Sequence, residues 1–108
     1  VNGFEKASME KIGLIDEIIP RYRSTYFNHI FAGGYSSGYY SYIWSAVLDS
    51  DAFNAFVNSG DVYNPELAQK YRKYILSAGG SDNSMKLYRM FRGEDPSIEA
   101  LLAKRGLN

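Results

Sequence analysis

The sequence has no cysteine and only one histidine, His29, among its 108 residues. Without cysteine, neither a disulfide framework nor a thiolate metal site can form. A zinc site needs at least three protein ligands, and neither a second histidine nor a His-Glu-x-x-His motif accompanies His29. We therefore expect these residues to bind no metal by themselves.

An excess of charge is missing as well, since 12 Lys and Arg residues balance 12 Asp and Glu residues. A neutral chain has no electrostatic attraction to nucleic acid or to an anionic membrane surface. No segment approaches the roughly 20 apolar residues that a membrane-spanning helix needs. We expect neither nucleic acid nor a membrane as a partner. The lack of cysteine leaves cytoplasmic and periplasmic locations both open.

Strand-like alternation is also lacking, and helical periodicity dominates the sequence. The chain is long enough for one domain at most, and we expect an all-α fold of four to five helices. Capping residues and glycine stops place the helix ends. The expected helices run from Phe4 to Ile12, from Gly38 to Asn58, from Pro65 to Ala78, from the cap Ser81 to Arg92, and from Pro96 to Gly106.

The segments between the first helices carry loop signals. Leu14–Pro20 is expected to be a connector, because the residue before a proline is disfavoured in the α conformation. Arg21–Phe31 fits either a helix or an irregular segment. Ala32–Ser37 is expected to be a loop, since two adjacent glycines cost too much backbone entropy inside a regular element. Ser36 or Ser37 is then expected to cap the next helix.

Apolar side chains predict how the helices pack. In Gly38–Asn58 they lie almost all round the helix, which is typical of a buried helix. Each of the next two helices carries a single apolar stripe instead. The stripes consist of Leu67, Tyr71, Tyr74 and Ile75 in one helix and of Met85, Tyr88 and Phe91 in the other.

The aromatic and glycine-rich run from His29 to Trp44 is the most informative part of the sequence. It lacks the spaced glycines and the terminal Gly-Lys-Ser/Thr of a phosphate-binding loop. Gly33 and Gly34 are either a plain turn between helices or a hinge that brings Tyr35 onto a ligand. The sequence alone leaves both interpretations open.

The polar side chains of this run have two interpretations as well. His29 is either a satisfied, partly buried histidine or a hydrogen-bond donor aimed at a substrate. Tyr35, Tyr39 and Tyr42 would share one face if all three were helical. They form either an aromatic core stripe or a set of neutral donors in a cleft, because a buried phenol needs a hydrogen-bond partner.

The run from Tyr22 to Trp44, YRSTYFNHIFAGGYSSGYYSYIW, closely resembles the C-terminal segment of the thimet oligopeptidase family of zinc peptidases. The form HIFAGGY is most similar to the bacterial peptidyl-dipeptidase branch of that family. The resemblance covers nearly the whole chain and is weaker before Ile18. It continues through VLDSDAF from Val47, ILSAGGS from Ile75, LYRMFRG from Leu87 and PSIEALLAKRGL from Pro96.

The resemblance implies that residues 1–108 are the C-terminal helical segment of a larger, mostly helical clamshell peptidase. The start at Val1, without methionine, fits a fragment. In such a peptidase, zinc is held by a His-Glu-x-x-His helix and a later glutamate, all upstream of this segment. The resemblance therefore implies zinc in the full-length parent and none bound by this fragment.

Two residues are implied in catalysis by the resemblance. Tyr42 matches the tyrosine that stabilises the tetrahedral intermediate across from zinc. Tyr35 matches the tyrosine at the end of the mobile glycine loop and is a second candidate donor to the oxyanion.

Four further residues are implied in substrate binding. His29 matches the family histidine near the substrate backbone, and Tyr39 matches a tyrosine that contacts substrate. Gly33 and Gly34 match the hinge of the mobile loop. The partners implied are a short peptide substrate and the remainder of the peptidase chain.

We therefore expect the C-terminal part of a zinc-dependent oligopeptidase or peptidyl-dipeptidase that cleaves short peptides. The alternative is a non-catalytic helical module that binds peptides or serves a structural role. A segment that packs against the rest of a larger protein should, when taken alone, leave an apolar and aromatic surface exposed. We expect this surface above all on the helix after the glycine loop and on the first helix. The resemblance favours removal of dipeptides from the C-terminus of short peptides, but the sequence does not settle the choice between endopeptidase and dipeptidase action.

Overall fold

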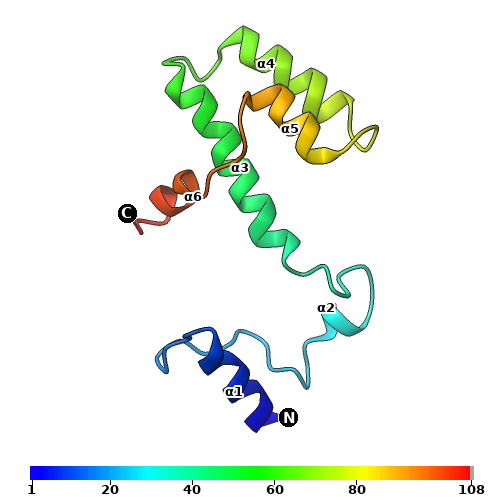
Figure 1. Cartoon of the computed structure of the whole chain (residues 1–108), viewed down its shortest axis with the longest axis vertical. Helices are drawn as coiled ribbons and strands as arrows, with labels where there is room; N and C mark the ends of the chain where they lie inside the picture. Colours follow the sequence, from blue (N-terminus) through cyan, green and yellow to red (C-terminus); the bar gives the residue numbers. More distant parts are fainter. Residues whose placement is uncertain (108) are drawn as a thin grey trace. The chain divides into compact units, whose positions relative to one another are not determined.

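The computed structural model describes residues 1–107 (Figure 1). It is all-α, as predicted, and none of the described residues forms a strand. No helix in this part of the chain is both long and apolar enough to cross a membrane. The elements are α1 (Asn2–Lys11), α2 (Asn28–Phe31), α3 (Ser41–Asn58), α4 (Pro65–Tyr71), the π-helix η1 (Arg72–Ser77), α5 (Ser84–Arg92) and α6 (Glu99–Lys104).

The chain divides into two compact units. The first unit, Val1–Tyr40, holds α1 and α2, and the second unit begins at Ser41 and holds the remaining helices. Five of the helical stretches correspond to the predicted helices, with α4 and η1 counted as one. The single turn α2 lies in the segment for which the sequence left helix and irregular structure both open.

In the first unit the end of α1, the connector and the loop lie close to their predicted positions. The chain leaves α1 through Gly13, whose φ of 75° lies in the left-handed region that glycine adopts without strain. Turns and irregular backbone fill the predicted connector, and the segment Arg21–Phe31 is mostly turns before it forms α2. The predicted loop Ala32–Ser37 contains no regular element.

The predicted start of the long helix at Gly38 is wrong, and so is the predicted cap at Ser36 or Ser37. Helix α3 begins at Ser41. Ser37 has a φ of 57°, which a residue that caps a right-handed helix does not adopt. Ser36 Oγ instead donates a hydrogen bond to the carbonyl of Ile30, at 3.1 Å. The turn therefore extends through Tyr40.

The N-terminus of α4 matches its prediction. The Asn64 side chain accepts hydrogen bonds from the backbone N–H groups of Glu66 and Leu67, both at 3.1 Å, and Pro65 occupies the first turn. After Tyr71 the helix widens into η1, which the sequence pattern did not predict. The helical stretch still ends where the Ala78-Gly79-Gly80 signal placed it.

Two other helix starts lie downstream of their predicted positions. Helix α5 is capped by Asn83, which accepts from the Lys86 N–H at 3.1 Å, and not by Ser81. Asn and Ser are both good caps, and Asn83 is the one next to the first helical residue. Helix α6 begins at Glu99 and not at Pro96, with Ser97 Oγ accepting from the Glu99 N–H at 3.2 Å.

The core of the second unit lies where α3, α5 and the α4–η1 stretch meet, and α5 runs beside the continuous α4–η1 stretch (Figure 1). Ala52 and Ala55 of α3 pack on Tyr88 and Phe91 of α5, and all four are buried. The two predicted stripes converge here, with Leu67 half-buried beside them. The partly buried residues around this core are Leu48, Phe56, Tyr71, Tyr74, Ile75 and Met85.

A buried carboxylate ties α3 to α5. The Asp51 residue is only 2% exposed. Its Oδ2 atom accepts from the Tyr88 hydroxyl at 2.6 Å and from Arg92 Nε at 3.2 Å. Burial, and then the hydrogen bond to this carboxylate, raise the pKa of Tyr88. The charge of Asp51 is thus satisfied inside the protein, as a buried charge requires.

The prediction that α3 is a buried helix is wrong for the described chain, because only part of α3 is covered. Val47, Ala52 and Ala55 are buried, whereas other apolar side chains of the helix face solvent. Four exposed apolar residues of α3 lie on one side of the helix and are called the open face below: Tyr42, Ile43, Phe53 and Val57. Trp44 is exposed as well, but it lies on the side of the helix opposite Phe53. Phe4 and Ile12, at the two ends of α1, are exposed too. The expectation of an exposed apolar and aromatic surface is therefore confirmed.

We predict that Tyr88→Phe lowers the free energy of unfolding by about 1–3 kcal/mol at pH 7, because it removes a donor from a buried carboxylate. Urea titration followed by helical circular dichroism measures this change. Tyr63→Phe is the matched control, since Tyr63 is 87% exposed. Equal urea midpoints for the two variants would contradict the role of the Asp51 network.

The raised pKa of Tyr88 predicts a loss of stability in alkali. Above pH 10 an unfolded tyrosine loses its proton, while folded Tyr88 keeps its own, so folding must take up a proton. This group's contribution is complete below about pH 10 and falls above it, by at most about 1.4 kcal/mol per pH unit. The free energy of unfolding, measured between pH 9 and 11, should fall less steeply with pH in Tyr88→Phe than in the wild type. An identical dependence on pH in the two proteins would exclude Tyr88 as the cause of the loss of stability.

Candidate functional site

Four aromatic rings gather around the imidazole of His29 in the first unit. The His29 ring centroid lies 5.7 Å from those of Tyr22 and Tyr39, and 6.1 Å from that of Tyr35. Phe27 stacks on Tyr22 at 4.9 Å and meets Tyr39 edge to face at 4.6 Å. These separations are typical of favourable aromatic contacts. We call this set, Tyr22, Phe27, His29, Tyr35 and Tyr39, the aromatic cluster.

The aromatic cluster has a half-buried part and an exposed part. Tyr22, Phe27 and Tyr39 are half-buried, whereas His29 and Tyr35 are exposed. The three half-buried rings thus form a base on which the imidazole and one phenol are presented to solvent. Such an arrangement limits the freedom of the two exposed side chains without covering them.

Local backbone structure brings these residues together. His29 lies in the single turn α2, and Ala32 follows in extended conformation. Gly33 has a φ of 110°, which only glycine adopts without strain, so the chain reverses there. The loop is then tied back by the Ser36 hydrogen bond to Ile30 and by the Gly38 N–H, which donates to the Tyr35 carbonyl at 3.0 Å. Tyr35 and Tyr39 follow this reversal with ring centroids 6.2 Å apart.

Tyr42 is the second residue of α3 and belongs to the other unit. It is 54% exposed and lies at the start of the open face. The structure therefore brings together three of the predicted side chains, His29, Tyr35 and Tyr39, and places Tyr42 on a separate element.

Tyr35, Tyr39 and Tyr42 are not all helical, so the condition under which they would share one helical face is not met. Only Tyr42 is helical, because α3 begins at Ser41. Tyr35 and Tyr39 approach each other through the turn instead. Spacings of three and four residues predict a shared face only within one continuous helix, and the left-handed Ser37 interrupts any helix here.

Tyr22 and Phe27 were not among the predicted site residues, although they form most of the base. The only signal in the sequence was the density of aromatic residues before His29. Arg21 adds a cation above the Tyr22 ring, 5.2 Å from its centroid.

The cluster offers hydrogen-bond donors and apolar ring faces. A phenol is a neutral donor at pH 7, and a neutral imidazole carries one donor and one acceptor. These groups suit the carbonyl and amide groups of a peptide. In the described part of the chain no three His, Cys, Asp or Glu residues stand close enough to hold a metal ion. The residues present therefore do not fit a zinc site.

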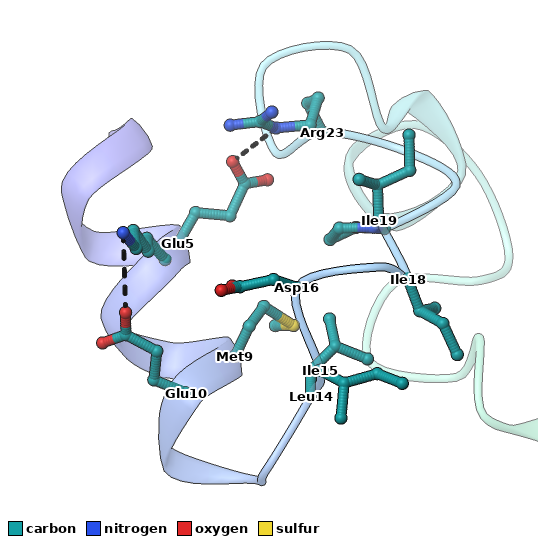
Figure 2. Close-up of a pocket in the computed structure, with 11 residues that line it drawn as sticks. Glu5, Met9, Glu10, Leu14, Ile15, Asp16, Ile18, Ile19 and Arg23 are labelled. Carbon is teal, nitrogen blue, oxygen red and sulfur yellow. Dashed lines mark hydrogen bonds and ion pairs between the residues drawn. The ribbon is translucent and has the colours of Figure 1, made fainter.

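Two cavities border other parts of the two units. In the first unit, a hollow of about 230 Å³ lies between α1 and the segment that follows it, and Figure 2 shows its mixed lining of carboxylates and isoleucines. In the second unit, a cavity of about 460 Å³ opens between α3, η1 and α5. Trp44, Leu48, Tyr71, Tyr74 and Met85 contribute apolar lining to it.

We predict that residues 32–38 are the most mobile internal segment of the chain. Few hydrogen bonds cross this exposed loop, and local opening of such a segment costs little free energy. Hydrogen exchange should be fastest there among internal amides. Gly34→Ala should leave hydrogen exchange in the loop unchanged, whereas Gly33→Ala should alter it. Of these two glycines, Gly33 is the one with a positive φ, which alanine adopts only with strain. Loop amides as protected as those of α3 would exclude a hinge.

Comparison with known proteins agrees with the resemblance seen in the sequence. The family model described as "Peptidase family M3" matches residues 4–107. Dipeptidyl carboxypeptidase of Escherichia coli is 47% identical over 91 residues, which cover 84% of this chain and 13% of the relative. Oligopeptidase A of the same organism is 48% identical over 81 residues, 75% of this chain and 12% of the relative.

A plant relative shows the same pattern. Probable cytosolic oligopeptidase A of Arabidopsis thaliana is 49% identical over 84 residues, which cover 75% of this chain and 12% of the relative. The chain thus spans only about one eighth of the length of the relatives it matches. The family match covers almost the entire chain, so the chain belongs to peptidase family M3.

Proposed function

We propose that these residues form the C-terminal part of a peptidase and supply its substrate-binding and oxyanion-stabilising groups. Two observations support this proposal. The chain aligns with only 12–13% of its bacterial relatives, and its aromatic cluster presents donors without any ligand set for a metal. The activity then belongs to a longer protein, and the described residues alone are expected to be inactive.

The proposed substrate is a short peptide. The relatives are named as a dipeptidyl carboxypeptidase and as oligopeptidases, and both names describe hydrolysis of short peptides. We favour release of C-terminal dipeptides, because the HIFAGGY form of the loop resembles the peptidyl-dipeptidase branch.

The aromatic cluster is proposed to bind the peptide backbone. His29 and Tyr39 would donate hydrogen bonds to substrate carbonyl groups, and the base of rings holds His29 in place. Gly33 and Gly34 would let the loop close over the bound peptide. Closure of a loop excludes water and strengthens each polar contact inside the site.

The oxyanion is proposed to be stabilised by Tyr42, with Tyr35 as a second donor. A neutral phenol aimed at the developing negative charge lowers the barrier without needing a change of protonation. We assign zinc and the base that activate water to other parts of the parent, because no three His, Cys, Asp or Glu side chains of residues 1–107 come together as a ligand set. The described residues contribute donors and no proton transfer.

The open face of α3 is proposed to pack against the remainder of the peptidase chain. It includes Ile43, which is 56% exposed, and Phe53, which is 60% exposed. An exposed apolar surface of this kind marks an interaction site more often than a free surface. Tyr42 begins this face, so the same packing would exclude water from its hydroxyl.

We predict that Tyr42→Phe in the full-length peptidase lowers kcat by about 10²–10³, the usual effect of removing one oxyanion donor. KM should change little, because the contact forms mainly in the transition state. Steady-state hydrolysis of a short peptide measures both constants.

Tyr40→Phe is the matched control for this test. Tyr40 lies two residues earlier, precedes α3 and is 68% exposed, so loss of its hydroxyl should leave kcat within about twofold of wild type. Equal and small effects of the two substitutions would show that Tyr42 does not stabilise the oxyanion.

A further inference from the structure

Glu5 is a buried carboxylate in α1 that takes no part in the proposed chemistry. It is only 7% exposed, although it lies in the first turn of an otherwise mostly exposed helix. A charged side chain is rarely buried to this extent unless it is paired. Its position therefore calls for partners from outside α1.

Those partners are two consecutive residues far along the chain. Arg23 Nε pairs with Glu5 Oε2 at 2.7 Å. Glu5 Oε1 accepts from the Ser24 backbone N–H at 2.8 Å and from Ser24 Oγ at 3.2 Å. The Ser24 backbone hydrogen bond, and then the Arg23 contact, hold the pKa of Glu5 below its usual range. Figure 2 shows the carboxylate reaching from α1 toward Arg23.

The segment that contacts Glu5, Arg23–Ser24, is adjacent in sequence to the aromatic cluster. Tyr22 immediately precedes Arg23, and its ring stacks on Phe27 and lies 5.7 Å from His29. Residues 21–27 form turns and no helix, so long-range contacts contribute much of what fixes their course. The Glu5 contacts fix both the side chain of one residue and the backbone of the next.

We propose that Glu5 is a positioning residue: by holding Arg23 and Ser24, it fixes Tyr22 and thereby the orientation of His29. The structural part of this inference stands on the distances above, and its catalytic consequence rests on the proposed role of His29 in substrate binding. Glu5 touches no reacting group in this scheme and acts only through the aromatic cluster.

The lone histidine makes the structural part directly measurable in the 108-residue chain. One imidazole gives a single set of ring proton signals, whose chemical shifts report the surrounding aromatic rings. Glu5→Ala should move these signals toward the values of an unstructured histidine and abolish the nuclear Overhauser contact between Tyr22 and His29. Alanine is a stronger helix former than glutamate, so α1 itself should persist, as its backbone amide shifts will show.

Two further variants sharpen the test. Glu5→Gln keeps an oxygen acceptor for Ser24 but loses the charge that pairs with Arg23, so its effect should be intermediate. Glu10→Gln should leave His29 unmoved, because Glu10 lies on the same helix but is exposed and pairs with Lys6, at 3.8 Å, within α1. If Glu5→Ala unfolds the first unit, Glu5→Gln decides the question. Signals of His29 that move no further in Glu5→Gln than in Glu10→Gln would overturn the proposal.

Kinetics of the full-length peptidase separate this inference from the proposed function. Glu5→Gln should raise KM for a short peptide about three- to tenfold, as expected for one weakened contact, with a smaller change in kcat. Displaced His29 signals together with unchanged KM would leave Glu5 as a positioning residue and refute substrate binding by His29. Unmoved signals would refute the positioning role whatever the kinetics.

Discussion

The second unit depends above all on the buried carboxylate of Asp51. Its hydrogen bonds to Tyr88 and Arg92 join α3 to α5 beside the apolar contacts of the core. A buried charge loses its compensation when its donors move away, and an uncompensated buried charge is very costly. The network therefore favours the register of α3 on α5 in which both donors reach Asp51. Every side chain of the open face is oriented by that register.

The first unit also contains a buried and paired carboxylate, but fewer apolar side chains pack around it. Glu5, like Asp51, is a buried carboxylate whose donors come from a distant part of the chain. The donors to Glu5 lie in a segment of turns, so these contacts hold a loop in place. The contacts of Asp51 in the second unit hold a helix in place. Side chains on loops are placed accurately only when their supports are fixed. The aromatic cluster and Tyr42 therefore both stand on elements held by internal ion pairs.

The sequence predicted those features that local chemistry determines. Asn64 and Pro65 start α4 through contacts within one turn, and Tyr88 and Phe91 face the core because their spacing fits one helical face. The sequence did not predict the start of α3, which depends on the left-handed Ser37. Nor did it predict the pairing of Glu5 with Arg23, because residues 18 positions apart meet only through the tertiary fold. His29, Tyr35 and Tyr39 were predicted, but Tyr22 and Phe27, the other two rings of the base, were not.

The proposed role of Tyr42 places a condition on its surroundings. A donor stabilises an oxyanion strongly only where water is excluded, since bulk water weakens any charge interaction several-fold relative to a protein interior. Tyr42 is 54% exposed in the described chain, so the residue is not enclosed there. The open face that it shares with Ile43 and Phe53 is apolar and favours cover for a second reason, because apolar surface is stabilised by leaving water. Packing against the remainder of the peptidase would bury that face and, at the same time, exclude water from the Tyr42 hydroxyl. Completion of the fold and completion of the oxyanion site would then be the same step.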